Sequence, residues 1–253
     1  MKNFYVFVVL GLFLFSVGCS DDTKDLNWGF STDESVLPIK TDIKLIDSLV
    51  RESFVLQVTY KDKKFTVPCE LVNDSIVYLD KTFEKWYQVI SQLPNLQTLY
   101  KGENEIELFE TKQDLFAKLE YKIIKSSLPF ESVQTKAGTG LIGTVTLYDD
   151  VNYKDRSISY FASINQYSED NYLDDEGSGY FNDKTSSLKV FYTDSDTNYC
   201  AIFTGYENSY YGGRTLVITS TGTTNVPNLK NIPCGSGNWN DRISSLTFQI
   251  AER

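Results

Sequence analysis

The residue types best suited to chemistry gather in two short stretches, NDKTSS at Asn182–Ser187 and NDRISS at Asn240–Ser245. Each stretch combines carboxylate, amide and hydroxyl oxygens and contains no soft ligand. Hard cations such as Ca²⁺ bind about six to eight oxygens from such groups and from backbone carbonyls. The two stretches therefore predict oxygen-lined cation sites and disfavour zinc or copper.

Both stretches belong to a longer unit that occurs twice. Two tyrosines five residues apart open each unit, Tyr148 and Tyr153 in the first and Tyr206 and Tyr211 in the second. The polar stretch begins 34 residues after the opening tyrosine in both units, and corresponding positions lie 58 residues apart. An alternating apolar run, typical of a strand, follows each stretch. Two repeats of one supersecondary unit explain this pattern.

The aromatic-x4-aromatic-x-Gly opening and the (Asn/Asp)-(Asn/Asp)-x-x-(Ser/Thr)-Ser ending resemble the βγ-crystallin domain in its calcium-binding, microbial form. The resemblance covers roughly residues 141 to 251. The first copy has Asp155 where the second has Gly213, and aspartate is among the few residues tolerated in the left-handed geometry expected there. The resemblance implies two four-stranded Greek keys packed into one domain.

The resemblance further implies Ca²⁺ as the cofactor, at two sites that each draw ligands from both repeats. The first site would join Asn182, Asp183, the carbonyl of Lys184 and Ser186 to Glu207, and the second would join Asn240, Asp241, the carbonyl of Arg242 and Ser244 to Asp149 or Asp150. The positive charges of Lys184 and Arg242 predict weak binding, on the order of 10⁻⁴ M. The alternative is that both loops are turns only, since Asn, Asp and Ser favour turns without a metal.

The first 18 residues resemble the signal peptide of a bacterial lipoprotein. A cationic start precedes the apolar run Phe4–Val17, which is too short for a bilayer span of about 20 residues, and Gly18-Cys19 follows. We expect cleavage before Cys19 and its acylation, for instance with palmitate. The acidic residues at 21 and 22 resemble a tag for the outer face of the outer membrane, which predicts a surface-exposed lipoprotein. The alternative is an ordinary secretory signal with an incidental cysteine.

A tether is predicted at 19–40, and an α+β domain of unknown role at 41–130. Alternation predicts a hairpin from Phe54–Tyr60 and Phe65–Leu71, with Cys69 on its buried face. Further strands are expected at 75–79 and 105–109, and helices after the capping residues Asp80 and Thr111. We interpret the aromatic stripe of the first helix as core.

The composition of residues 131–140 predicts a linker, and short alternating segments separated by Gly, Asn, Asp and Ser predict an all-β sandwich at 141–253. The resemblance implies that this sandwich is a βγ-crystallin-like double Greek key. Strands are proposed at 143–148, 157–161, 187–192, 200–206, 215–219 and 245–250. Cys200 and Cys234 are the only cysteines of this domain. In oxidising surroundings they predict a disulfide worth roughly 3 kcal/mol.

Composition excludes several functions. A net charge of −10 argues against nucleic acid and against adhesion to anionic lipid. Because the chain contains no histidine, Ser-His-Asp and Cys-His catalytic sites are excluded, as are the common histidine zinc sites. The acidic run from Asp174 to Glu176 is better explained as a solvated loop than as a catalytic carboxylate pair, so we expect no enzyme.

These features predict a calcium-binding module of a cell-surface lipoprotein with a structural or interaction role. The alternative is a secreted or surface protease inhibitor or toxin-like protein on the same fold. Its partner surface would be the tyrosine-rich loops at 167–180 and at Tyr206, Tyr210 and Tyr211. In the βγ-crystallin fold, several of these tyrosines are expected in the core.

Overall fold

The computed structural model describes residues 51–119, 143–164, 167–175, 177–193 and 198–253. The described residues belong to one compact unit, Ile46–Arg253. The predicted signal peptide, Cys19, the tether, the linker at 131–140 and Glu176 lie outside the described residues. None of the described helices is both long and apolar enough to cross a membrane.

The N-terminal part of the compact unit mixes strands and helices in the order β1 (Arg51–Tyr60), β2 (Lys63–Val72), β3 (Ser75–Tyr78), α1 (Lys81–Ile90), β4 (Gln97–Gly102), β5 (Glu105–Phe109) and α2 (Lys112–Leu119). The predicted hairpin is confirmed, because β1 pairs antiparallel with β2. The predicted caps are also confirmed: Asp80 accepts hydrogen bonds from the first turn of α1, and Thr111 accepts one from the first turn of α2.

The aromatic stripe of α1 packs as core, as predicted. Phe83 and Tyr87 are buried, and their rings contact Tyr78 on β3. Trp86 stacks on Phe65 of β2 with a centroid distance of 4.8 Å. Alternating apolar residues on β1 and β2 thus meet an aromatic helix face, and this contact attaches α1 to the sheet.

The C-terminal part contains one unit of four strands twice. The first unit is β6 (Gly143–Asp150), β7 (Lys154–Ala162), β8 (Tyr167–Asp170) and β9 (Ser187–Tyr192), and the second is β10 (Tyr199–Asn208), β11 (Gly212–Ser220), β12 (Thr223–Val226) and β15 (Ser245–Glu252). The short ladder of β13 (Pro233–Cys234) and β14 (Gly237–Asn238) precedes β15. Alternation predicts the first, second and fourth strand of each unit, but not β8 or β12, which are short.

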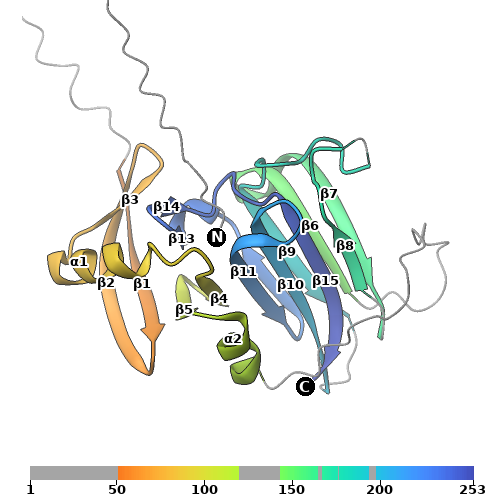
Figure 1. Cartoon of the computed structure of the whole chain (residues 1–253). Helices are drawn as coiled ribbons and strands as arrows, with labels where there is room; N and C mark the ends of the chain where they lie inside the picture. The colour runs from red at the N-terminus through yellow and green to blue at the C-terminus, as the bar shows by residue number, and fades with distance from the viewer. Residues whose placement is uncertain (1–50, 120–142, 165–166, 176, 194–197) are drawn as a thin grey trace, which may run out of the picture. The chain divides into compact units, whose positions relative to one another are not determined.

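Each unit gives its third strand to the sheet of the other unit. β8 pairs with β15, and β12 pairs with β9. In the described part of the chain, one sheet therefore has the order β12-β9-β6-β7, and the other contains β11-β10-β15-β8. Figure 1 shows the green strands β6 and β7 in one layer and the blue strands β10, β11 and β15 in the other. The predicted double Greek-key sandwich is present.

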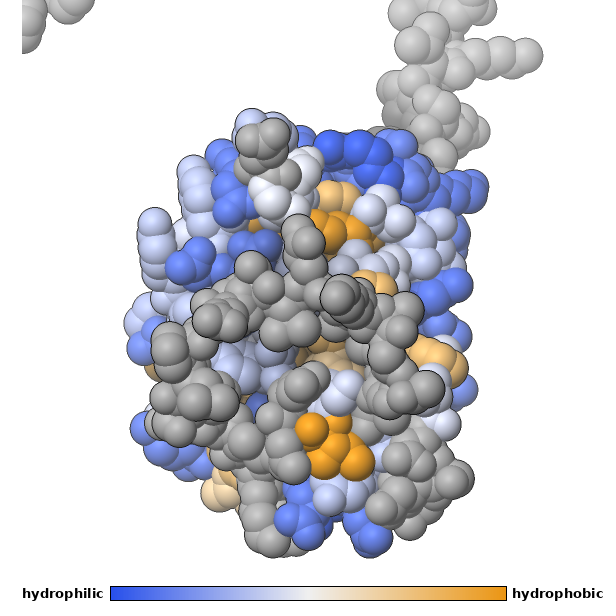
Figure 2. All heavy atoms as spheres, turned by 90° about the vertical axis from the view of Figure 1, so that its right-hand side faces the viewer, coloured by the Kyte–Doolittle hydropathy of each residue, from blue (hydrophilic) through white to orange (hydrophobic). Residues whose placement is uncertain are grey.

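The surface beside β7 and β8 faces the viewer in Figure 2. Where grey atoms do not cover it, this side is mainly hydrophilic and carries only small, separate hydrophobic spots. Most residues of β7 are exposed or half-buried, which agrees with this view.

One sheet continues from the C-terminal part into the N-terminal part. β4 pairs in parallel with β11, so that its full order is β3-β2-β1-β5-β4-β11-β10-β15-β8. Across this junction Thr215 N donates to Leu96 O at 3.2 Å. The parts expected as domains at 41–130 and 141–253 thus share one continuous sheet, and both belong to the compact unit Ile46–Arg253. Without β4, strand β11 would expose a row of unpaired backbone groups.

Two hydrophobic clusters lie on different faces of β10. Ala201 and Phe203 belong to the larger cluster, whereas Cys200 and Ile202 belong to a smaller one with Leu115 of α2. Cys234 is part of the larger cluster. The predicted Cys200–Cys234 disulfide is absent from the structure. The prediction fails because strand alternation turns Cys200 away from the cluster that holds Cys234.

Candidate cation site between the two repeated loops

The two polar stretches lie against each other and exchange equivalent backbone hydrogen bonds. Asp183 N donates to Ile243 O at 3.2 Å, and Asp241 N donates to Thr185 O at 3.0 Å. These four positions correspond to each other at the 58-residue repeat. Asp183 and Asp241 have φ angles of 49° and 53°, in the left-handed region where aspartate is tolerated. The loops are thus related by an approximate two-fold axis.

The side chains of the two loops also cross. Ser186 Oγ donates to Asp241 Oδ1 at 3.2 Å, and Ser244 Oγ donates to Asp183 Oδ1 at 3.0 Å. Ser244 Oγ also contacts the carbonyl oxygen of Glu207, at 2.9 Å. Each carboxylate therefore lies beside the hydroxyl of the other loop, so every candidate ligand set contains residues from both repeats.

The grouping of ligands differs from the one in the sequence analysis. Asp183 lies beside Ser244, whose hydroxyl also contacts the carbonyl of Glu207. Asp241 lies beside Ser186. The left-handed backbone at each aspartate directs its carboxylate toward the opposite loop, which the sequence spacing does not reveal. Lys184 and Arg242 occupy equivalent third positions in the two loops.

Asp149 and Asp150, the alternatives for the second site, are both engaged in local contacts. Asp150 Oδ1 caps Val151 N at 2.7 Å, and its carbonyl accepts a hydrogen bond from Ser187 Oγ at 2.7 Å. The Asp149 carboxylate pairs with Arg156, at 2.6 Å from Nη2. Since Asp149 corresponds to Glu207, its carbonyl rather than its carboxylate is the equivalent candidate ligand.

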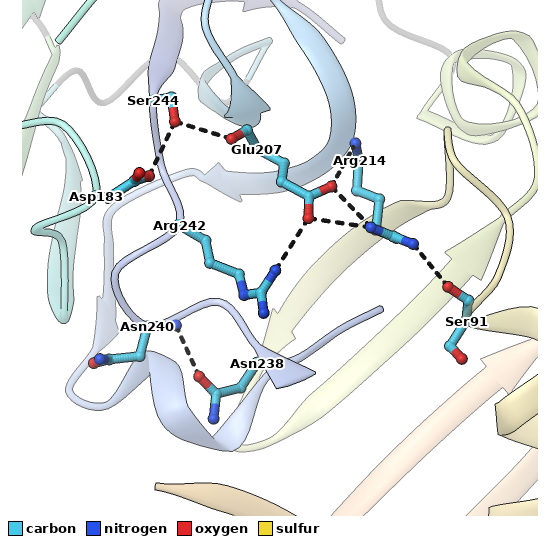
Figure 3. A network of polar contacts seen from close by, with 8 residues as sticks. All are labelled: Ser91, Asp183, Glu207, Arg214, Asn238, Asn240, Arg242 and Ser244. Atoms are coloured by element: carbon cyan, nitrogen blue, oxygen red, sulfur yellow. Dashed lines mark hydrogen bonds and ion pairs between the residues drawn. The ribbon is translucent and has the colours of Figure 1, made fainter. Parts of the chain in front are cut away.

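The carboxylate of Glu207 is held by two guanidinium groups, as Figure 3 shows. Arg214 Nη1 lies 2.9 Å from Oε2, and Arg242 Nη1 lies 3.1 Å from Oε1. Arg214 Nη2 also donates to the carbonyl of Ser91, at the end of α1, at 2.9 Å. This network connects the candidate site to the N-terminal part of the compact unit.

Two glycines leave room for these guanidinium groups. A Cβ on Gly235 would lie 2.9 Å from Arg214 Cζ, and one on Gly237 would lie 2.9 Å from Arg242 Nη2. The turn between β13 and β14 thus packs directly on both arginines. Arg156 and Arg214 lie 58 residues apart, so the repeat spacing itself could have identified them as partners of Asp149 and Glu207.

The arginines leave Asp183 and Asp241 as the carboxylates that face the shared space. Neither forms an ion pair with a described cation. Although Asp241 as a whole is exposed, partial burial of its carboxylate raises its pKa, and the nearby charge of Asp149 adds to this rise, whereas the hydrogen bond from Ser186 opposes it. A bound cation would offset this cost of keeping Asp241 charged.

The two loops and the start of the β10–β11 turn form an open polar hollow, lined by Asp183, Glu207, Asn208, Asn240, Asp241 and Arg242. Asn182 Oδ1 and Asn240 Oδ1 are equivalent buried oxygens without a hydrogen-bond partner among the described residues. The described residues contain no cluster of three or more His, Cys, Asp or Glu side chains suited to a metal. The donors present are single carboxylates, hydroxyls, amides and carbonyls, a set that fits a weakly held Ca²⁺.

A pair of tyrosine rings also occurs in both repeats. It packs on the hairpin that carries the carbonyl of Asp149 in the first repeat and that of Glu207 in the second. Tyr148 and Tyr153 form an edge-to-face pair with centroids 5.6 Å apart, and Tyr206 and Tyr211 form another at 5.4 Å. The last serine of each stretch fixes the same turn, because Ser187 Oγ accepts from Tyr153 N and Ser245 Oγ accepts from Tyr211 N.

The fold of the C-terminal part follows from two features: its two Greek keys exchange their third strands, and their polar loops cross. The C-terminal part is a βγ-crystallin-like domain. The left-handed backbone predicted at Asp155 and Gly213 is confirmed, since their φ angles are 61° and 76°.

No family model matches the sequence, and no curated protein does. Among solved structures, the chain is similar to a beta gamma crystallin from Ciona intestinalis, at 18% identity and a TM-score of 0.27, over 41% of this chain and 95% of that chain. It is also similar to a betagamma-crystallin from an archaeon, at 24% identity and a TM-score of 0.27, over 42% of this chain and 95% of that chain. The βγ-crystallin-like assignment rests on the strand exchange and the paired loops.

Proposed function

We propose that this protein is a non-enzymatic calcium-binding module of the βγ-crystallin type. One Ca²⁺ would bind Asp183, Ser244 and the carbonyls of Glu207 and Arg242. The other would bind Asp241, Ser186 and the carbonyls of Asp149 and Lys184. The observation that supports the proposal most is the crossed arrangement of both loops, in which each carboxylate lies within 3.2 Å of the hydroxyl of the other repeat.

Calcium at these sites would stabilise the contact between the two Greek keys, because each ion would take ligands from both. Binding to the folded state alone stabilises it by about 2.7 kcal/mol per site at a hundredfold excess over the dissociation constant. With dissociation constants on the order of 10⁻⁴ M, millimolar calcium would fill the sites. Arg214, Arg242 and Arg156 neutralise the neighbouring carboxylates, which supports a structural rather than a catalytic role.

The test is a calorimetric Ca²⁺ titration of the chain from Ser20, compared with an Asp183→Asn/Asp241→Asn variant. Asparagine keeps the left-handed backbone and removes the charge. The matched control is Glu52→Gln/Asp62→Asn, which removes two exposed carboxylates of β1 and its turn. The wild type and the control should bind calcium and melt at a higher temperature in calcium than in EDTA. If the wild type gives no heat of binding and melts at the same temperature in calcium and in EDTA, the loops are turns only.

The lipid anchor and the outer-membrane location are part of the proposal and rest on the signal-like sequence before Cys19. A lipidated module would present the calcium sites outside the cell. Labelling with a radioactive fatty acid tests this, since a Cys19→Ala variant should lose the label that the parent carries. Nothing in the described residues favours the protease-inhibitor or toxin-like alternative.

A further inference from the structure

Three tyrosines of the described C-terminal part are exposed, and two of them, Tyr172 and Tyr210, form a pair. Tyr172, just after β8, is 39% exposed, and Tyr210, in the β10–β11 turn, is 72% exposed. Their rings are nearly parallel, with 7° between the planes and 6.4 Å between the centroids. Tyr210 N donates to Asn171 O at 2.8 Å, so the two loops that carry the rings are fastened together.

The fold itself does not require aromatic residues at this place, as the other repeat shows. Asn152 N donates to Pro227 O at 2.8 Å. This hydrogen bond is the counterpart of the one from Tyr210 N to Asn171 O, and Asn152 is the counterpart of Tyr210. Asn228 is then the counterpart of Tyr172, because Leu229 N and Leu173 N make equivalent bonds to Ser186 O and Ser244 O. The same junction is thus built once with two asparagines and once with two exposed tyrosines.

Carboxylates lie beside Tyr172, the first ring of the pair, and among the described residues none of them is paired with a cation. Tyr172 Oη donates to Asp174 Oδ2 at 3.3 Å, and Tyr172 N donates to Asp170 Oδ1 at 3.0 Å. Neither carboxylate, nor that of Asp175, forms an ion pair within the described part of the chain. The charge of Asp174 is also the main reason why the pKa of Tyr172 is raised. Arg156, which reaches Gly179 O on this loop, is already paired with Asp149.

We propose that Tyr172 and Tyr210, together with Asp170, Asp174 and Asp175, form a docking site for the lysine or arginine side chains of a basic protein segment. An aromatic face attracts a cation placed within about 6 Å of its centroid, and adjacent carboxylates add charge complementarity. Tyrosine is also a favoured residue at the centre of interfaces. This site lies beyond the proposed calcium function and does not depend on it.

The test measures fluorescence anisotropy of a labelled eight-residue peptide of alternating arginine and glycine, at 0.15 M salt. A peptide with citrulline in place of arginine has the same shape without the charge. The variant Tyr172→Asn/Tyr210→Asn installs the residues that the other repeat uses, so its fold should be kept, as its melting temperature will show. Tyr180→Asn is the matched control, because Tyr180 is 59% exposed on the same loop.

The wild type and the Tyr180→Asn variant should bind the arginine peptide with affinities within twofold of each other. Loss of two cation–π contacts should weaken binding by the double variant about fivefold to thirtyfold. Asp174→Asn/Asp175→Asn should weaken it as well. Equal binding by the double variant would show that net charge alone attracts the peptide and would overturn the site. Equal binding of the citrulline peptide, or no binding by the wild type, would also overturn it.

Discussion

Replacing Glu207 with glutamine removes the carboxylate that Arg214 and Arg242 share. The Glu207 side chain is only 16% exposed and that of Arg214 only 20% exposed, so solvent compensates the two guanidinium groups poorly. Removing one partner of a largely buried pair costs several kcal/mol, whereas exposed pairs contribute less than about 1 kcal/mol. For this partly buried network we expect a loss of about 2 kcal/mol in the free energy of unfolding.

The matched control is Asp149→Asn in the other repeat. Asp149 is bonded to Arg156, whose side chain is 50% exposed, so the control should cost less than about 1 kcal/mol. For a domain of this size, about 2 kcal/mol corresponds to a fall in melting temperature of roughly 6 °C. Calorimetric unfolding in EDTA measures both variants in the absence of bound calcium. Equal shifts for the two variants would refute the argument that burial makes the Glu207 network the stronger one.

Three further outcomes follow from burial and backbone geometry. Burial raises the pKa of the Cys69 and Cys234 thiols to about 12. At pH 8 a thiol reagent should therefore modify neither cysteine in the native protein and should react with both only after unfolding. Rapid labelling of the native protein would contradict their burial. Gly213→Ala should destabilise by about 1 kcal/mol or more in a denaturant titration, because φ is 76° there, whereas Asp155→Gly at the equivalent position should be neutral or slightly stabilising. Leu115→Ala should cost about 2 to 5 kcal/mol, because this residue is fully buried between α2 and the sheet; a cost below 1 kcal/mol would show that α2 is not anchored there.

The repeat was visible in the sequence because its spacing is exact and its polar residues are unusual. The hairpin of β1 and β2 and the caps at Asp80 and Thr111 were visible for similar local reasons. β4 was not predicted, since its residues 97–100 are all buried and show no alternation. The crossing of the loops also escaped prediction, because the direction of the Asp183 side chain depends on a left-handed backbone and on packing against the other repeat.

The disulfide prediction failed for a related reason. Two cysteines in one domain suggest a bridge only if their side chains reach the same space, and the face on which Cys200 lies depends on the register of β10. Likewise, the sequence carries no local signal that β11 pairs with β4, because parallel pairing joins residues more than a hundred positions apart. The contacts that sequence patterns did not predict are thus those that depend on tertiary packing.

The exchange of third strands has a consequence for how this chain acquires its structure. β8 has no partner until β15, at residues 245–252, has been synthesised, and β9 has no outer neighbour until β12 exists. The first repeat therefore cannot complete its strand pairing alone, and both repeats are expected to become ordered in one cooperative step that requires β15.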